Sequence, residues 1–399
     1  MFGTQSTKRP TSLALALALL AFLVLACTAV LFAQSNQQDQ QKPAQQTAPP
    51  EAGGPQGDIG PIVLPKKNPD EAPPPPKEER QIPKNPEGMP DFSLRVDVPN
   101  VQVPVLVTTK DGTFVPGLHQ ENFKVSEDGV PQQITSFKAV QDAPITAVLL
   151  VEFAANSGWF MYDALNASYA FANTLKKDDW IAVITYDMKP YILSDFTQDK
   201  REVYGALAQL RIPGFRETNM FDALYDTLDR MDRIQGRKYV ILVSTGLDTF
   251  SKLNYDQILK KVKETQNVGI FTISTGEALR LRAEARGAGN PEYGMWNLNF
   301  LQADNEMNTF AKMTGGRWYK PRFEGELPEI FADIGQQIRN QYIITYKPTN
   351  AKQDGTYRKL KVELQGPEGG PLTVKDQKGK TLKTQVIARE GYTAKHEVE

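Results

Sequence analysis

Cysteine and histidine, which are common in catalytic and zinc sites, are scarce in this sequence. The chain has one cysteine, Cys27, within an N-terminal apolar run, and two histidines, His119 and His396, that lie far apart in the sequence. A hydrolase triad requires a nucleophile beside a base, and a zinc site requires several thiolate or imidazole ligands. The patterns GxSxG, GxxxxGKS/T and HExxH are absent, and no GxGxxG follows the first strand of the central region. We therefore expect that the protein is not an enzyme.

A second chemistry, protein recognition, is indicated by residues 276–299, which follow an apolar strand and are longer than an ordinary strand-to-helix loop. This insertion combines arginines at near-helical spacing with bulky side chains: Arg280, Arg282, Arg286, Tyr293, Met295 and Trp296. Arg and aromatic side chains dominate the binding energy of protein interfaces. We predict that Arg282 and Trp296 contact a partner. The alternative is a short solvated helix whose Trp296 packs beneath the sheet.

The elements that would position this insertion alternate between strand and helix patterns from Ile145 to Asn340. Continuous apolar runs such as ITAVLLVEF and WIAVITY suit central strands, and amphipathic stretches such as 301–313 and 327–339 suit the helices between them. This alternation predicts a mostly parallel sheet covered by helices on both faces. Open sheets of this class bind ligands at the carboxyl ends of their strands, where the insertion begins.

Strand patterns without helices flank this central region. FSLRVDV and VQVPVLVTT precede it, and QYIITYKP and TYRKLKVEL follow it. So few strands would leave apolar edges exposed if either flank stood alone. We therefore predict one small β-sandwich formed by both flanks (91–142 and 341–393), with the α/β domain (143–340) inserted between them and a short tail at 394–399.

Residues 1–33 are typical of an export signal. Lys8 and Arg9 precede a long apolar run that ends at Ala33. The run is also close to the ~20 residues that span a bilayer, so an uncleaved anchor is an alternative, and lipidation at Cys27 is a third. Residues 34–90 are rich in Pro and Gln and poor in large apolar residues, which predicts a disordered linker. All three interpretations place the rest of the chain outside the cytoplasm, in the periplasm, the cell envelope or the extracellular space.

The charge balance argues against one class of partner. The chain carries 46 Lys and Arg against 47 Asp and Glu, a formal net charge of -1. Nucleic-acid-binding domains need a basic surface that neutralises phosphates. We therefore expect a protein partner and no nucleic acid.

Residues 145–340 resemble the von Willebrand factor A domain family. The resemblance is carried by an apolar strand that ends in an acid, a distant Thr before a helix start, and a later apolar strand with a Gly-x-Asp tail: Glu152, Thr218, Asp222-Ala223-Leu224 and Gly246-Leu247-Asp248. The flanking sequences at 107–129 and 341–364 are similar to those of bacterial exported proteins that contain such a domain. The resemblance implies a doubly wound, Rossmann-like α/β fold that binds other proteins.

In that family a divalent cation binds to Asp-x-Ser-x-Ser after the first strand, a Thr from a second loop and an Asp from a third. At the matching positions this chain has Glu152, Ala154, Asn156, Thr218 and Thr245. Magnesium prefers near-octahedral oxygen ligands and carboxylate charge, which these replacements reduce. The resemblance therefore implies a degenerate metal-ion-dependent adhesion site (MIDAS) at Glu152, Asn156, Thr218 and Thr245. We expect no cofactor there, and bound Mg²⁺ is the alternative.

These features together predict a non-enzymatic, adhesion-like protein-binding domain that is exported to the cell envelope. Recognition is expected at the carboxyl-end face and the 276–299 insertion, without a strict need for a divalent ion. The alternative is a structural or assembly component of the envelope, in which the linker and the β-sandwich provide the tether.

Overall fold

The computed structural model describes residues 100–141, 143–155, 168–210, 215–285, 291–366, 369–375 and 378–394, except for the side chains at 282, 283, 285 and 291–296. The expected signal or anchor at 1–33, the linker at 34–90 and the tail after Ala394 lie outside the described residues. Within the described part, no helix combines the length and the hydrophobicity needed to cross a bilayer.

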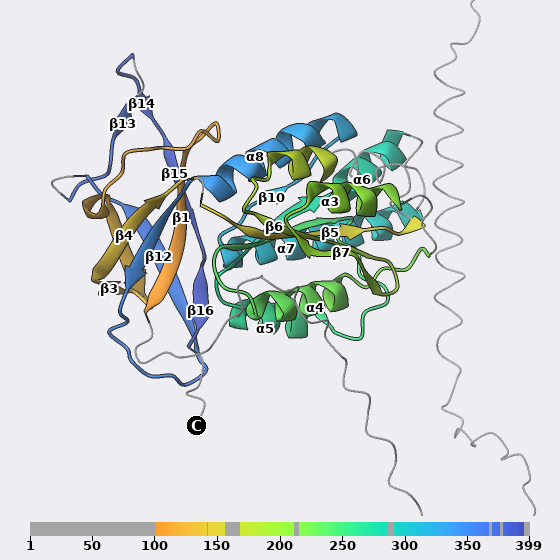
Figure 1. Cartoon of the computed structure of the whole chain (residues 1–399), viewed down its shortest axis with the longest axis horizontal. Coiled ribbons are helices and arrows are strands. Elements are labelled where there is room, and N and C mark those ends of the chain that lie inside the picture. Colours follow the sequence, from red (N-terminus) through yellow and green to blue (C-terminus); the bar gives the residue numbers. More distant parts are fainter. Residues whose placement is uncertain are drawn as a thin grey trace, which may run out of the picture. The chain divides into compact units, whose positions relative to one another are not determined.

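A six-stranded sheet forms the centre of the α/β domain (Figure 1). Its spatial order is β10 (Trp318–Tyr319), β9 (Val268–Ser274), β8 (Lys238–Ser244), β5 (Thr146–Glu152), β6 (Trp180–Tyr186) and β7 (Pro190–Thr197). All neighbours are parallel except β6 and β7, which are antiparallel. Every residue of β5 and β8 is buried, as expected for strands that are covered on both faces. The predicted mostly parallel sheet is confirmed.

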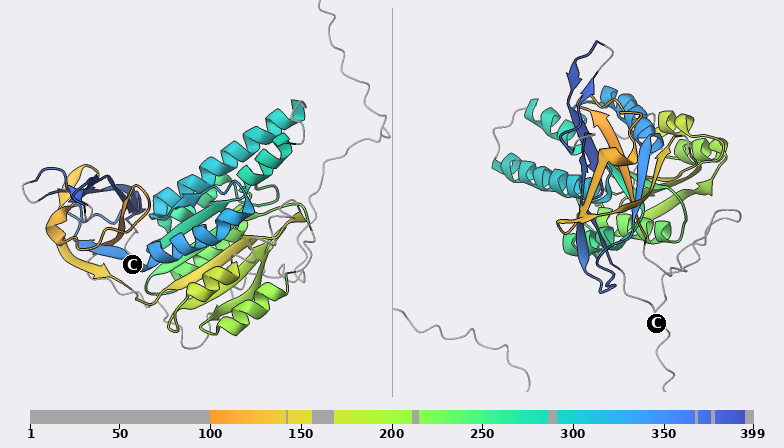
Figure 2. Two further views of the ribbon diagram at one scale, coloured as in Figure 1. Left: turned by 90° about the horizontal axis from the view of Figure 1, so that it is seen from above. Right: turned by 90° about the vertical axis from the view of Figure 1, so that its left-hand side faces the viewer.

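Helices cover both faces of this sheet (Figure 2). Residues 168–174 are helical, and the labelled helices are α3 (Lys200–Ala208), α4 (Met220–Asp232), α5 (Tyr255–Glu264), α6 (Gly276–Ala285), α7 (Pro291–Thr314) and α8 (Leu327–Arg339). The 168–174 helix, α3 and α8 share one buried cluster with the strands, which includes Phe171 and Phe331. Helices α4, α5 and α7 share the cluster on the opposite face, which includes Leu224 and Phe310.

Two glycines connect α7 to β10. Gly315 has a φ of 77°, in the left-handed region that favours glycine. A Cβ atom at Gly316 would overlap the carbonyl oxygen of Ile270 in β9. Only glycine therefore allows the chain to pass this close to β9 before it forms the edge strand.

The insertion differs from its sequence prediction. Helix α6 and the start of α7 account for most of 276–299, and α7 begins at Pro291 instead of Leu301. Proline at the first position of a helix loses no hydrogen bond and has a suitable φ. Figure 2 shows α6 beside the first half of α7, with both extending beyond the sheet.

Strands from both flanks pair in two four-stranded sheets. The first has the order β15 (Thr384–Ala388), β1 (Val101–Thr109), β11 (Gln341–Tyr346) and β4 (Ile134–Val140). The second has the order β16 (Gly391–Thr393), β12 (Tyr357–Leu364), β2 (Phe123–Glu127) and β3 (Val130–Gln132). Side chains from both sheets, such as Val105 and Phe123, belong to one buried cluster. A separate hairpin pairs β13 (Val374–Lys375) with β14 (Thr381–Leu382).

The α/β domain leaves and re-enters the flanking strands at adjacent points. It begins after β4 and returns into β11, and these strands are hydrogen-bonded neighbours with Val140 opposite Gln341. A buried ion pair lies beside both connections. Arg339, the last residue of α8, places its Nη1 atom 3.0 Å from Oδ1 of Asp179. The same Asp179 oxygen accepts from the Ile145 amide at 3.0 Å, just before β5. One charged pair therefore fixes the first strand and the last helix of the domain to each other.

The flanking strands also contact the ends of two helices. The Glu390 amide donates to the Met313 carbonyl at 3.3 Å, near the end of α7. The Thr393 hydroxyl donates to the Lys263 carbonyl at 3.0 Å, near the end of α5. These contacts hold the flanking strands against the α/β domain in addition to the two chain connections.

Candidate functional site

Glu152 ends β5 at the centre of the six-stranded sheet. Its paired residue on the neighbouring strand β6 is Tyr186, and Ser244 ends β8, the neighbouring strand on the other side. Parallel strands bring their carboxyl ends to one edge of a sheet, which is where open α/β folds bind ligands. Glu152 is nevertheless only 4% exposed. The acid at this edge is therefore turned into the protein.

Both carboxylate oxygens of Glu152 accept hydrogen bonds from the end of β8. The Thr245 hydroxyl lies 3.0 Å from Oε1 and 2.8 Å from Oε2. The Thr245 amide and the Ser244 hydroxyl donate to Oε2 at 2.7 and 2.8 Å. The Ser244 hydroxyl in turn accepts from the Tyr186 hydroxyl at 2.8 Å. We call these four residues the closed site, because their polar atoms bond to one another.

Among the described residues, the hydrogen-bond partners of the Glu152 carboxylate are hydroxyl and amide groups, with no Lys or Arg side chain among them. Burial raises the pKa of the Glu152 carboxyl above 4.5, and the negative charge of Asp248 adds to the rise. Hydrogen bonds from Ser244 and Thr245 act in the opposite direction. A buried carboxylate is costly unless hydrogen bonds compensate for its lost hydration. The hydroxyl and amide donors of β8 provide that compensation here.

The other oxygen groups near the closed site are also engaged. The Thr218 hydroxyl donates to the Leu247 carbonyl at 2.6 Å. Asp248 accepts from the Phe221 amide at 2.8 Å and from the Ser251 hydroxyl at 2.6 Å. Since Phe221 lies in the first turn of α4, Asp248 stabilises the start of that helix.

The described residues do not fit a divalent cation. Magnesium needs several oxygen ligands in near-octahedral geometry. Ala154 is buried and has no side-chain oxygen, while the oxygens of Glu152, Thr218 and Thr245 already bond within the protein. Asn156 lies outside the described residues. Within the part that the structure describes, no group of three or more His, Cys, Asp or Glu side chains is placed to hold a metal.

Two exposed phenylalanines flank the closed site. Phe215 is 49% exposed and Phe250 is 50% exposed. Their backbones are fixed to the site loops, since the Ala155 amide donates to the Phe215 carbonyl at 2.6 Å and the Phe250 amide donates to the Thr218 carbonyl at 2.9 Å. Exposed aromatic rings on well-fixed loops are the groups that fill pockets in a partner protein. The edge therefore carries two half-exposed aromatic rings on loops that are hydrogen-bonded to the strand ends.

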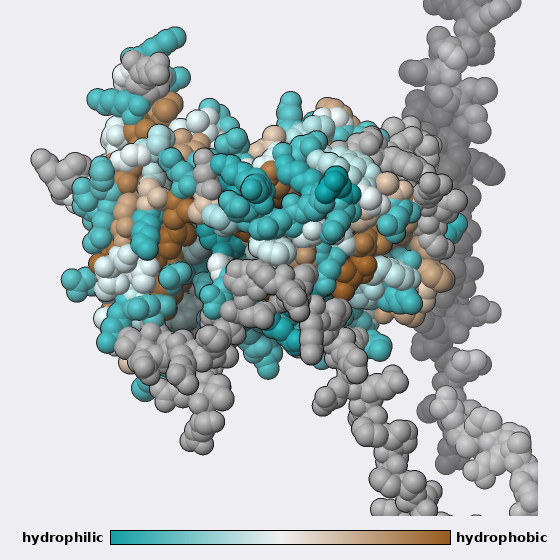
Figure 3. Space-filling model, viewed as in Figure 1, coloured by the Kyte–Doolittle hydropathy of each residue, from teal (hydrophilic) through white to brown (hydrophobic). Residues whose placement is uncertain are grey.

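Other exposed apolar side chains lie in segments that follow the carboxyl ends of β6, β9 and β10: Tyr191, Ile192, Leu298, Leu301 and Phe323. Figure 3 shows a hydrophobic patch over the β7 side of the α/β domain. Among the described residues, Val130 in the flanking strands is the one large exposed hydrophobic residue outside these segments and the two phenylalanine loops. Most of the large exposed hydrophobic side chains among the described residues therefore lie in segments that follow the carboxyl ends of the strands, while Figure 3 also shows hydrophobic surface over the flanking strands.

The predicted contact residues lie in the helical insertion. Arg282 is in α6 and Trp296 is in α7, and their side chains lie outside the described part. Arg280, in contrast, is mostly buried, so it is not available to a partner in the way that the sequence of the insertion suggests. Its side chain is 13% exposed and pairs with Glu277 one turn away.

Ion pairs hold the base of α6 and α7. Lys320, which follows β10, lies 3.1 Å from Glu277 in α6 and 3.1 Å from Asp304 in α7. The Ser274 hydroxyl at the end of β9 donates to Asp304. A hollow of about 220 Å³ between the two helices is lined by Arg280, Leu281, Glu284, Asn297 and Leu301. The insertion is thus anchored at its base by ion pairs and a hydrogen bond.

The structure brings together part of the site that the sequence predicts. Glu152 and Thr245 are in direct contact, and Thr218 is linked to Thr245 through Leu247, whose amide lies 3.3 Å from the Thr245 hydroxyl. The sequence prediction missed Ser244 and Tyr186, as well as the two exposed phenylalanines. A buried acid at a strand end requires donors from the neighbouring strands. The hydroxyls that end β8 were the signal that could have identified the closed site.

Comparisons with known proteins give partial likenesses. No protein-family profile and no curated protein sequence matches the chain. Solved structures similar to it include proximal thread matrix protein 1 from the mussel byssus, with 13% identity over 53% of this chain and 51% of that chain and a TM-score of 0.40. The vWF domain of the type V pili tip protein Mfa5 from Porphyromonas gingivalis has 14% identity over 50% of this chain and 96% of that chain, with a TM-score of 0.37.

A von Willebrand factor type A structure from Catenulispora acidiphila has 12% identity over 68% of this chain and 75% of that chain, with a TM-score of 0.37. The chain spans about half the length of the byssus protein. One structure of the byssus protein has a zinc-occupied MIDAS motif.

Proposed function

We propose that this chain is an exported, non-enzymatic protein-binding module of the von Willebrand factor A type, which binds its partner at the carboxyl-end edge of the α/β domain without a divalent cation. The observation that carries the proposal is the closed site, where Glu152 bonds to Thr245 and Ser244. A cation would have to break these bonds and would find no oxygen at Ala154. Residues 1–33, as an export signal or anchor, support a location in the cell envelope.

Apolar contact takes the place of a cation bridge in this proposal. Phe215 and Phe250 are each about half exposed, and full burial of a large apolar side chain stabilises a complex by about 1.5–3 kcal/mol. A few such anchors supply most of the binding energy of a typical interface. Arg282 and Trp296 on the helical insertion are proposed as further anchors of the same interface.

We further propose that the two flanking four-stranded sheets form one β-sandwich that carries the α/β domain, with residues 34–90 as a tether to the envelope. The shared buried cluster of the two sheets supports this arrangement. Recognition would then be separated from attachment, with the α/β domain facing the partner and the flanks facing the tether.

Site-specific photo-crosslinking in the native host tests where the partner binds. A photoreactive amino acid at Phe250 is compared with one at Val130, which has a matched exposure of 52% but lies in the flanking strands. We expect a discrete protein adduct from position 250 and none from position 130. An adduct from position 130 alone would contradict the proposal, and equal adducts with many envelope proteins from both positions would favour a structural component of the envelope.

Chelation tests whether the interface depends on metal. We expect EDTA to leave the adduct at position 250 unchanged, and calorimetric titration of the chain with Mg²⁺, Mn²⁺ or Ca²⁺ to give no binding heat. Phe250→Ala should weaken partner binding by about 2 kcal/mol, as for other exposed aromatic anchors. Loss of the adduct on chelation, with Phe250→Ala harmless, would show that a cation bridge operates.

A further inference from the structure

A basic hairpin extends from the flanking sheets. Strands β13 and β14 form their own two-stranded sheet outside both four-stranded sheets, and Figure 1 shows them projecting from the flanks. Four exposed lysines lie on or beside these strands: Lys375, Lys378, Lys380 and Lys383. A fifth exposed lysine, Lys110, follows β1, and its amide donates to the Lys383 carbonyl at 3.0 Å. We call these five lysines, together with strands β13 and β14, the lysine hairpin.

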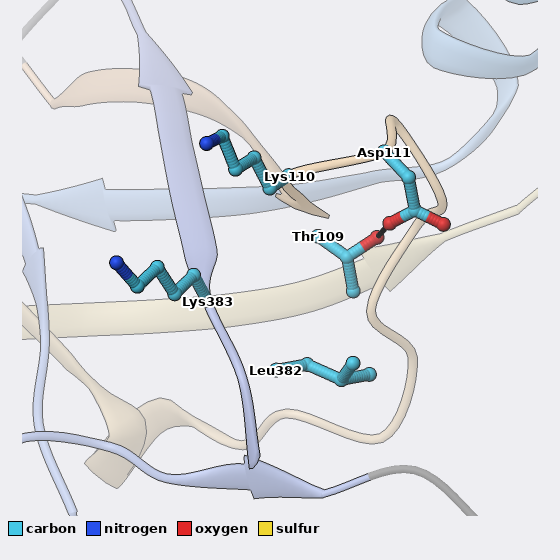
Figure 4. A pocket seen from close by; sticks show the side chains of 5 residues that line it. All are labelled: Thr109, Lys110, Asp111, Leu382 and Lys383. Atoms are coloured by element: carbon cyan, nitrogen blue, oxygen red, sulfur yellow. Dashed lines mark hydrogen bonds between the residues drawn. The ribbon is translucent and has the colours of Figure 1, made fainter. Parts of the chain in front are cut away.

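The base of the lysine hairpin is hollowed. A hollow of about 370 Å³ is lined by Thr109, Lys110, Asp111, Leu382 and Lys383. Figure 4 shows the side chains of Lys110 and Lys383 extending to the same side, with the Asp111 carboxylate turned away from them. Asp111 accepts hydrogen bonds from the Thr109 hydroxyl and, at 3.2 Å, from the Thr113 hydroxyl. The neighbouring acid is therefore held apart from the two ammonium groups.

The composition of the lysine hairpin distinguishes between classes of anionic partner. Residues 374–383 contain four lysines and one acid, Asp376, with no Arg and no aromatic residue, in a chain whose net charge is -1. Lysine is depleted at protein–protein interfaces. Single-stranded nucleic acids are bound with aromatic stacking platforms, which this segment lacks. A cluster of four to eight basic residues, in contrast, is typical of binding to anionic lipids.

We propose that the lysine hairpin docks on an anionic phospholipid surface through the phosphates of the lipid headgroups. Its charge is complementary to such a surface, and the hairpin stands clear of the sheets that would otherwise keep the lysines from a flat bilayer. This docking site is independent of the closed site and of the partner-binding edge.

Vesicle flotation of the full-length chain tests the proposal. The partition of wild type onto phosphatidylcholine vesicles is compared with its partition onto vesicles that also contain phosphatidylglycerol. The triple variant K375E/K380E/K383E reverses the charge of three of the five lysines of the hairpin, and K124E/K347E/K359E makes the same charge change at exposed lysines on or beside the other flanking strands. The N-terminal apolar segment is common to all three chains, so only the difference between the two lipid compositions is interpreted.

We expect phosphatidylglycerol to increase the partition of wild type and of the control variant. The increase measured for the hairpin variant should be at least about tenfold smaller. Added salt should reduce the wild-type increase because exposed charges are screened. Equal partition onto both lipid compositions, or equal losses in both variants, would overturn the proposal. Tighter binding to inorganic polyphosphate than to vesicles at the same phosphate concentration would also overturn it and would assign the hairpin to a soluble polyanion. Unchanged circular dichroism and thermal melting of both variants exclude unfolding as the cause.

Discussion

Replacement of Glu152 with Gln separates a closed hydrogen-bonded site from a metal ligand. Gln has nearly the same size and can place its carbonyl oxygen at the Oε2 position, where the Thr245 amide and the Ser244 hydroxyl donate at 2.7 and 2.8 Å. Its amide group then faces the Thr245 hydroxyl, which can accept a hydrogen bond as well as donate one. We expect every polar group of the closed site to remain bonded in Glu152→Gln.

The expected change in the free energy of unfolding follows from two opposing contributions. Hydrogen bonds to a charged group contribute about 1.5–3 kcal/mol each and neutral ones about 0.5–1.5, so neutralisation weakens the bonds from Ser244 and Thr245 by about 3 kcal/mol in total. Removal of a buried charge recovers a desolvation penalty of several kcal/mol. Burial is the largest influence on the pKa of Glu152 and raises it, so the desolvation term is larger. We predict that Glu152→Gln changes the free energy of unfolding at neutral pH by between zero and about 1 kcal/mol in the stabilising direction.

The pH dependence has a defined sign. The unfolded chain releases the Glu152 proton near the ordinary pKa of 4.5, whereas the folded protein retains it to higher pH. Stability from this group is therefore fully present below the unfolded pKa and is lost as the pH rises through the raised folded pKa. Urea unfolding of the full chain, followed through the fluorescence of Trp180 and Trp318 beside the core of the α/β domain, measures this loss. As the pH rises from the unfolded pKa of Glu152 through its folded pKa, the wild-type protein should lose stability relative to Glu152→Gln.

Two results would refute this reasoning. One is a destabilisation of Glu152→Gln by more than about 2 kcal/mol at neutral pH, which would mean that the charge is worth more than its desolvation. The other is a rise in wild-type Tm with Mg²⁺ that Glu152→Gln abolishes. Glu152→Ala is the matched control, because it leaves a cavity and unpaired hydroxyls and should cost about 3 kcal/mol or more.

Three further substitutions test the framework around the site. Arg339→Met leaves Asp179 buried without its cation and should cost about 3–5 kcal/mol in urea unfolding, so a cost below about 1 kcal/mol would contradict the importance of this pair. Gly316→Ala places a methyl group against the Ile270 carbonyl and should lower stability by about 2 kcal/mol or more in thermal melting. Gly205→Ala, in an exposed part of α3 with open space around it, should instead raise stability by up to about 1 kcal/mol, and a loss there would contradict the helix argument.

Local sequence patterns predicted the α/β elements well where they are unambiguous. The apolar run WIAVITY forms β6 over Trp180–Tyr186, and the amphipathic stretch 327–339 forms α8 with the expected bounds. Such segments have one hydrophobic period and clear flanking residues. The start of α7 was not predicted, because Gly289, Pro291 and Gly294 favour a loop in isolation. Contacts of α6 with α7 and ion pairs at their base, which are not local, override that preference.

The bonding of the candidate site depends on strand order, which no local pattern encodes. Glu152 meets Tyr186 and Ser244 because β5 lies between β6 and β8 in the sheet. The sequence identifies these residues as strand ends, but it does not state which strand ends are neighbours. The sequence resemblance therefore implies a weakened metal site, but it does not indicate that the Glu152 side chain reaches Thr245 and bonds to it.

The register of β1 and β11 determines how the molecule carries a pulling force. The chain enters β1 at Val101, which lies opposite Tyr346, whereas the α/β domain joins β11 at Gln341, beyond the other end of the paired segment. A partner that pulls on the α/β domain against an attachment before β1 therefore draws the two strands past each other along their axes. The five residue pairs between Val101 and Val105 and their partners on β11 are then loaded together, in shear, instead of one after another. Unfolding under force is governed by the unfolding rate. Under such a load, the pairing of β1 with β11 would have to rupture as a unit before the α/β domain could separate from the chain that precedes β1.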